Sequence, residues 1–192
     1  MIFRETLLHG LFIVEPEKIE DQRGFFACSW TAEAFAMRGL NPKLVQCNVA
    51  ANKARGTVRG MHFQIKPHEE TKLVRCTRGA VYDVAIDLRN DSPTRYRWVS
   101  AELTSDNHRM LYVPEGFAHG YQTLTDNAEV FYQISEYYHP ESAGGVRWDD
   151  PAFAIDWPLP VTVIAERDAT YSLIHVPLVK DPDARIRQTD FP

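Results

Sequence analysis

Short runs of alternating apolar and polar residues, separated by Gly, Pro, Asn and Asp, dominate the chain between residues 45 and 138. Alternation with a period of two is typical of strands that bury one face. The runs predicted to be strands are Val45–Ala50, Gly56–Gln64, Thr71–Thr77, Ala80–Leu88, Arg97–Glu102, Arg109–Val113, Gly120–Leu124 and Glu129–Tyr138. This series, with turn signals between its members, favours an all-β fold, either an antiparallel β-sandwich or a jelly roll.

The N-terminal part adds a strand, a turn and a helix. The apolar run Leu11–Val14, within the segment Phe3–Glu15, is followed by a proline and predicts a strand that ends there. The sequence Asp-Gln-Arg-Gly at Asp21–Gly24 is typical of a turn. A helix is expected over Thr31–Arg38, so the fold prediction includes one or a few short helices.

The predicted helix has both of its end signals. Thr31 can cap the N-terminus, and Gly39 can end the helix. Phe35 and Met37 are the side chains expected to be available to a hydrophobic core.

Length and composition indicate one globular domain. With 192 residues the chain can bury a sizeable core, and we expect a single domain over residues 1–175 followed by a tail at 176–192. The net charge of −5 and the dispersed basic residues give no footprint for nucleic acid. An anionic substrate would therefore need a local cluster of Arg and Lys.

Cysteine usage and hydropathy indicate a soluble cytoplasmic protein. The three cysteines are odd in number and form no Cys-x-x-Cys pair, which fits a reducing compartment. The N-terminus lacks a basic-then-apolar signal pattern, and no apolar run approaches the ~20 residues that span a bilayer.

The stretch Gly56–Asp87 places Arg59, His62, Lys72 and Asp83 on predicted strands, which can hold side chains rigidly enough for chemistry. Strict alternation puts Arg59 and His62 on opposite faces of one strand. The two could share a pocket only if a bulge interrupts the strand, and the glycine between them, residue 60, is suited to one.

Two further strands carry residues with both a functional and a structural interpretation. Lys72, on a face with Val74 and Cys76, could stabilise a developing oxyanion or could be an edge-strand lysine that discourages aggregation. Tyr132 and Tyr138 share a strand face with aliphatic residues, and this face could line a pocket or pack in the core.

Part of the metal-binding pattern of cupin jelly rolls is also present. Gly56 and His62 are spaced as in the first cupin motif, and Pro114–His119 fits the second. A complete metal site needs a second histidine two residues after the first, and that residue is Gln64. Metal-free chemistry is therefore the favoured interpretation, and a metal-dependent cupin enzyme is an alternative.

Nine pieces of the chain match one known family in the order in which that family has them. They are Asp21–Phe26, Gln46–Asn48, Gly56–Gln64, Lys72–Arg75, Arg78–Arg89, Val113–Gly120, Tyr132, Arg147–Pro151 and Glu166–Asp168. On these pieces, which span roughly residues 1–175, the chain resembles the dTDP-4-dehydrorhamnose 3,5-epimerases. The resemblance implies a cupin-type jelly roll and epimerisation of a nucleoside-diphosphate 4-keto-6-deoxy sugar, with no metal or redox cofactor.

Epimerisation beside a ketone needs a base, a group that holds the enolate oxygen, and an acid on the other face of the sugar. His62 is the natural base, because its unperturbed pKa of ~6.5 leaves it largely neutral at cell pH. The resemblance implies Asp168 as the carboxylate that orients His62, Lys72 as the enolate-stabilising cation and Tyr132 as the acid. From the sequence alone, Asp168 could equally be a loop or helix-capping residue.

The residues expected to bind substrate are Arg23, Phe26, Gln46, Asn48, Arg59, Asp83, His119 and Tyr138. The two arginines suit a diphosphate, although Arg23 could equally be an exposed loop residue. Gln46, Asn48 and Phe26 match residues on the nucleotide side in the family. Asp83 lies on an otherwise apolar face, so it needs a partner if buried, and we expect Lys72 beside it.

The resemblance also implies a homodimer that exchanges its N-terminal strands, so that Phe3–Val14 would carry Arg23 and Phe26 to the neighbouring site. Cys28 and Cys47 stand where the family often has acidic residues, which leaves the identity of the nucleotide open. Epimerisation at one carbon only, and a sugar-nucleotide binding module without turnover, are alternatives.

Overall fold

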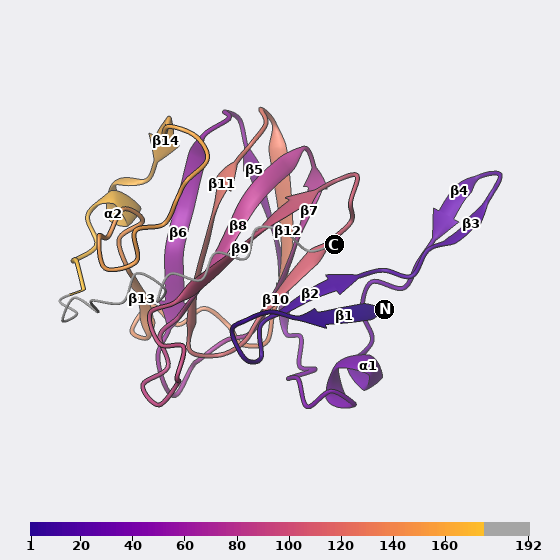
Figure 1. Cartoon of the computed structure of the whole chain (residues 1–192), viewed down its shortest axis with the longest axis horizontal. Helices are drawn as coiled ribbons and strands as arrows, with labels where there is room; N and C mark the ends of the chain where they lie inside the picture. Colours follow the sequence, from indigo (N-terminus) through magenta and orange to yellow (C-terminus); the bar gives the residue numbers. More distant parts are fainter. Residues whose placement is uncertain (175–192) are drawn as a thin grey trace.

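The computed structural model describes residues 1–174, which form two antiparallel sheets packed face to face, a projecting hairpin and two short helices (Figure 1). The first sheet has the strand order β1-β2-β10-β7-β12-β5 and the second β13-β6-β11-β8-β9, with β14 parallel to β6. The elements are β1 Ile2–Glu5, β2 Phe12–Glu15, β3 Ile19–Asp21, β4 Gly24–Phe26, α1 Ala32–Ala36, β5 Gln46–Asn52, β6 Thr57–Gln64, β7 Lys72–Arg78, β8 Ala80–Asp87, β9 Trp98–Thr104, β10 Met110–Val113, β11 Phe117–Thr123, β12 Ala128–Ile134, β13 Ala143–Gly145, β14 Val163–Ile164 and α2 Glu166–Ala169. The predicted all-β, cupin-type jelly roll is confirmed.

The main core lies between the two sheets. Ile13, Val74 and Leu111 from the first sheet and Val81 and Leu103 from the second are all fully buried in one cluster. Burying apolar side chains from both inner faces holds the sheets together. One end of the interior is left for polar side chains, and the cavity described below lies there.

The predicted strands all exist, with ends that differ by a few residues. The largest difference is in β12, which ends at Ile134 instead of Tyr138. After Ile134 the carboxylate of Glu136 accepts the backbone N–H of Tyr137 at 2.9 Å, and the chain leaves the sheet. Residues 135–139 therefore form a loop at the mouth of the cavity.

The predicted helix is shorter than expected. Its N-cap is confirmed, because the Thr31 hydroxyl accepts the backbone N–H of Ala34 at 3.1 Å. Phe35 is 1% exposed and packs against aromatic rings of the first sheet. The expectation that Met37 would also enter the core is wrong, since it is 78% exposed. Two residues correspond to a rotation of about 200° around a helix, so Met37 faces away from the side that Phe35 buries.

The hairpin β3–β4 projects away from both sheets (Figure 1). Its turn lies at the predicted Asp21–Gly24. Arg23 is exposed there and its guanidinium pairs with Asp21, while Phe26 is 74% exposed. Neither side chain is among those that line the two cavities described below.

Strand β6 has the expected bulge at Gly60. In the β6–β11 register, two residues of β6 lie opposite Gly120 alone, between the pairs that Arg59 and His62 make with β11. Gly60 has φ of +130°, and a Cβ there would lie 2.5 Å from the Cα of Gly120. The bulge inserts one extra residue into β6 and so shifts the alternation of its side chains. Arg59 and His62 therefore line the same cavity, as predicted.

The last described elements, β14 and α2, lie beside β6 (Figure 1). This return of the chain brings Asp168 to the second sheet. The predicted tail at 176–192 lies outside the described residues. Within residues 1–174 all three cysteines are free thiols, and no helix there is both long and apolar enough to cross a membrane.

Candidate active site

A cavity of about 450 Å³ is lined by side chains from both sheets. The predicted residues that line it are Gln46, Asn48, Arg59, His62, Lys72, His119, Tyr132 and Tyr138. The structure thus brings together most of the residues singled out in the sequence, from strands far apart along the chain.

His62 and Asp168 form a hydrogen-bonded pair at the wall of this cavity. The Nε2 atom of His62 lies 2.8 Å from Oδ1 of Asp168, and Oδ2 of Asp168 accepts the backbone N–H of Gly60 at 3.1 Å. Because a carboxylate can only accept, Nε2–H donates, and neutral His62 keeps its lone pair on Nδ1. Asp168 is 2% exposed and does not line the cavity itself.

Burial favours the neutral form of His62. Burial lowers the pKa of His62 below its usual value, Asp168 opposes this shift, and the cations Lys72 and Arg167 add to it. Burial alone would raise the pKa of Asp168, but the hydrogen bond from His62 holds it below its usual range. A neutral imidazole beside an ionised carboxylate is the arrangement that a general base requires.

Arg167 is a cavity residue that sequence reasoning missed. Its Nη2 lies 3.2 Å from Nε2 of His62, and its Nε donates to Asp168 at 3.3 Å. Since the Nε2–H group already donates a hydrogen bond to Asp168, the guanidinium acts on the imidazole as a neighbouring positive charge. The only sequence signal was its position next to Asp168.

A second histidine–carboxylate pair lies deeper. Nε2 of His119 donates to both carboxylate oxygens of Asp83, at 2.9 and 3.0 Å. Asp83 is fully buried and does not line the cavity, so its predicted contact with substrate becomes an indirect role through His119. The two residues lie diagonally across the adjacent strands β8 and β11, whose register pairs His119 with Ala85 and Asp83 with Tyr121.

The partner predicted for Lys72 is wrong. Lys72 Nζ pairs with Oε1 of Glu70 at 3.1 Å, whereas Asp83 is taken by His119. Both Lys72 and Glu70 are only about a tenth exposed, and both line the cavity. Glu70 was missed, although strand alternation places residues 70 and 72 on the same side.

Four tyrosines line the cavity, and the most buried is Tyr121, which is 4% exposed and hydrogen-bonds through its hydroxyl to Asn52. Burial raises the pKa of Tyr132, and Glu70 adds to this shift, so its phenol stays protonated at neutral pH. The exposed Tyr138 and the half-buried Tyr171 lie at the mouth, and the ring of Tyr171 meets His62 edge to face at 6.2 Å. Because the Tyr121 hydroxyl is bonded to Asn52, Tyr132 is the best protected of the other three phenols that can donate a proton into the cavity.

Polar side chains extend from these groups along the cavity. Arg59 Nε donates to Oδ1 of Asn52 at 2.8 Å, which fixes the guanidinium in place. Gln46 Nε2 donates to Oδ1 of Asn48 at 2.8 Å on β5. A fixed cation next to a row of amide groups can bind an anionic, hydrogen-bonding ligand.

Gln64 has no free polar group for a metal ion. Its Nε2 donates to the backbone carbonyls of His68 and Tyr137, both at 3.0 Å, and its Oε1 accepts the N–H of His139 at 2.7 Å. The side chain at the second-histidine position of the cupin pattern is thus used to join two loops.

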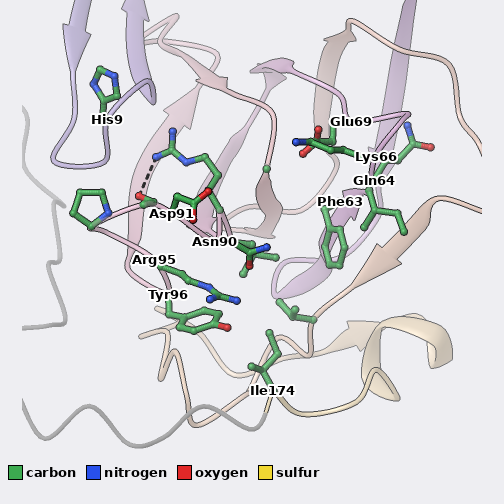
Figure 2. A pocket seen from close by; sticks show the side chains of 17 residues that line it. His9, Phe63, Gln64, Lys66, Glu69, Asn90, Asp91, Arg95, Tyr96 and Ile174 are labelled. Atoms are coloured by element: carbon green, nitrogen blue, oxygen red, sulfur yellow. Dashed lines mark hydrogen bonds between the residues drawn. The ribbon is translucent and has the colours of Figure 1, made fainter.

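A larger hollow of about 880 Å³ lies beyond Phe63 and Gln64 (Figure 2). Figure 2 shows Phe63 and Tyr96 in it together with charged side chains such as Lys66 and Arg95. None of the residues predicted to act on substrate lines this hollow. The smaller cavity, with its histidine–carboxylate pairs, is therefore the candidate active site.

Fold and site together define a class: a cupin-type jelly roll whose interior cavity carries a neutral base, a buried lysine and a protonated phenol. The model of the dTDP-4-dehydrorhamnose 3,5-epimerase family matches residues 5–175. The chain belongs to this family, and it is an epimerase.

Individual relatives agree. The chain is 42% identical over 180 residues to a dTDP-4-dehydrorhamnose 3,5-epimerase of Sinorhizobium fredii, covering 93% of this chain and 92% of the relative. It is 36% identical, with a TM-score of 0.84, to a dTDP-6-deoxy-D-glucose-3,5-epimerase of Legionella pneumophila in complex with dTDP-4-keto-L-rhamnose, covering 97% and 98% of the two chains. A 3'-monoepimerase of Streptomyces bikiniensis in complex with dTDP-quinovose is 30% identical, with a TM-score of 0.80 and coverage of 88% and 85%.

Proposed function

We propose that this chain converts dTDP-4-dehydro-6-deoxy-D-glucose into dTDP-4-dehydro-L-rhamnose by moving protons at the carbons beside the ketone. The observation that carries the proposal is that His62, held from behind by the buried Asp168, and the protonated Tyr132 line one cavity. The family of the chain and the dTDP-sugar bound by the Legionella pneumophila relative support the choice of substrate.

In the proposed mechanism, Nδ1 of His62 removes the proton from the carbon next to the ketone. Asp168 holds the imidazole and stabilises the imidazolium that forms. The electron pair of the broken C–H bond moves onto the ketone oxygen, and the ammonium group of Lys72 stabilises that enolate. Tyr132 then donates its phenolic proton to the opposite face of the carbon, and proton exchange with solvent restores both groups.

At the other end of the substrate, Arg59 binds the diphosphate, and Gln46 and Asn48 bind the nucleoside. Arg23 and Phe26 project on the β3–β4 hairpin, away from this protomer's own cavity. We propose that they serve the cavity of a second protomer in a homodimer of the single domain 1–175, acting in the cytoplasm. Sedimentation that gives only the 22.0 kDa monomer at micromolar concentration would contradict the dimer.

Epimerisation at a single carbon is the second candidate function. The 3'-monoepimerase among the relatives favours it, because a family member of similar fold is named for action at one carbon. The two functions share the same base and acid, so only the orientation of the sugar in the cavity distinguishes them.

Deuterium uptake tests the function directly. The protein is incubated in heavy water with dTDP-4-dehydro-6-deoxyglucose, and the sugar is examined by mass spectrometry and proton NMR. Deuterium at carbons 3 and 5 is expected, and deuterium at one carbon would identify the single-site enzyme. No uptake by folded protein would contradict both functions and favour a sugar-nucleotide binding module.

The variant Y132F separates the two proton transfers. Without a phenol, His62 can still remove and return a proton on its own face, so we expect deuterium to enter the starting sugar while the yield of epimer falls about 10²-fold or more. Loss of both exchange and epimer would contradict the assignment of Tyr132 as the acid. The variant Y137F, at the exposed neighbouring loop position, is the matched control.

A further inference from the structure

Outside the active-site cavity, His68, Glu136 and His139 form a compact cluster. One ligand atom from each lies within 4.8 Å of the other two, and each residue is half-buried. Within residues 1–174 this is the one group of three such residues that meets this distance. The two imidazole rings are stacked, with centroids 3.5 Å apart and planes 8° from parallel.

His139 has a carboxylate near each of its ring nitrogens. Its Nδ1 donates to Oε1 of Glu141 at 3.2 Å, which leaves the Nε2 lone pair directed to Oε1 of Glu136. The distance between these last two atoms is 4.0 Å, too long for a hydrogen bond. A zinc ion with bonds of ~2.1 Å to each atom would hold them about 3.4 Å apart at the tetrahedral angle, so the two atoms must move closer by about half an ångström on binding. A carboxylate on the other ring nitrogen is the usual support of a metal-binding histidine.

Gln64 fixes the backbone on both sides of the cluster. This glutamine, 5% exposed, bonds to the backbone of His68 on one loop and of Tyr137 and His139 on the other. The two loops therefore cannot drift apart while β6 is formed. A site held in place before a ligand arrives loses less entropy on binding.

We propose that His68, Glu136 and His139 bind a divalent transition-metal ion of the zinc type, with Glu141 orienting His139. Two imidazoles and a carboxylate are a common three-residue zinc ligand set, and water completes the coordination. An ion between parallel rings lies outside both ring planes, so the rings must rotate out of their stack on binding. Oε2 of Glu136 pairs with Lys43 at 3.2 Å and Oε1 accepts the backbone N–H of Tyr137 at 2.9 Å, so the ion binds the second lone pair of Oε1.

The position of the site gives the ion a role in the epimerase. Tyr138 lies between Glu136 and His139 and lines the active-site cavity. An ion that joins residues 136 and 139 fixes this loop, and with it the tyrosine at the cavity mouth. The ion is thus structural and takes no part in proton transfer.

The test is a zinc titration of metal-free protein by calorimetry, with histidine signals followed by NMR. We expect one zinc ion to bind per chain, and we expect the NMR signals of His68 and His139 to change as it binds. H68A and H139A should each lose that binding, and E141Q should weaken it about 10-fold, as loss of a supporting carboxylate does. H9A is the control, since His9 is an exposed histidine paired with Glu5 outside the cluster.

Three results would overturn the proposal: no stoichiometric zinc binding by the intact protein, unchanged binding in both H68A and H139A, or loss of binding in H62A instead. The last result would place the ion in the active-site cavity. Circular dichroism establishes that each variant is folded, and H68Q replaces H68A if the smaller side chain disturbs the loop. Because the readout is binding, failure here leaves the proposed epimerase activity unaffected, and absence of that activity leaves the zinc titration valid.

Discussion

The cavity contains two histidine–carboxylate pairs that differ in how the fold builds them. His119 and Asp83 come from adjacent strands of one sheet, and the side chain of His119 is 9% exposed. His62 is on the same sheet, but Asp168 arrives 106 residues later on α2, and the side chain of His62 is 31% exposed. In both pairs the carboxylate is buried and holds Nε2.

This difference separates a structural pair from a reactive one. The sheet ladder holds both members of the His119–Asp83 pair, so His119 is a fixed polar group in the cavity wall. The His62–Asp168 pair lies at the junction of the sheet with a short returning segment, next to Arg167. There the imidazole has access to the cavity and a neighbouring charge that adjusts its pKa, as a base needs.

The largest expected difference between the pairs is in catalysis. H62A should lower kcat/KM by about 10²- to 10⁴-fold and abolish deuterium uptake, because it removes the base. H119A should have a smaller effect on kcat/KM and leave uptake measurable. Equal losses in the two folded variants would contradict the assignment of separate roles.

The two carboxylates, Asp168 and Asp83, should differ in catalytic importance in the same way as the two histidines. D168N should lower kcat by about 10²- to 10⁴-fold with little change in KM, because the amide no longer stabilises the imidazolium. D83N should mainly lower the free energy of unfolding, by about 1–3 kcal/mol, since it disturbs a fully buried hydrogen bond. Denaturant unfolding and steady-state kinetics of both variants measure these two effects. A greater loss of activity in D83N than in D168N would contradict the prediction.

Arg167 should set the pH profile of the reactive pair. His62 must be neutral to act, so kcat/KM should fall as the pH drops through its pKa, which lies below the usual ~6.5. Arg167 contributes to lowering that pKa, so R167Q should move the acid limb of the profile to higher pH. R147Q, in an arginine paired with Asp149 away from the cavity, is the control. An unmoved acid limb in R167Q would show that the guanidinium does not influence the base.

The smallest expected effect is on the way in which the free energy of unfolding depends on pH. The pKa of His62 is lower in the folded protein than in the unfolded chain, so the unfolded chain takes up the proton first as the pH falls. The free energy of unfolding should therefore decrease as the pH falls below ~6.5 and stop decreasing once folded His62 is also protonated. H62N should lack this part of the pH dependence, and an identical pH profile in wild type and H62N would contradict it.

Sequence reasoning was most successful where a property depends on a few adjacent residues. Alternation predicted the strands and the shared face of Lys72 and Val74, and a glycine between Arg59 and His62 predicted the bulge. The prediction for Met37 failed because two residues of a helix are about 200° apart, so Met37 and Phe35 cannot face the same core. Glu70 was missed because an acidic residue just before a strand is ordinarily a solvated one.

By itself the sequence determined the all-β class, the family and most of the residues that line the cavity, because strand periodicity and motif spacing are local properties. Only the tertiary structure decided which carboxylate holds which histidine: Asp83 went to His119 rather than to Lys72, and Glu70 took Lys72. Ion pairs in a buried cavity depend on which strands become neighbours and on how the chain returns to them. Distances of 2.8 to 3.1 Å across such contacts are fixed by packing of the whole molecule, which no single stretch of sequence contains.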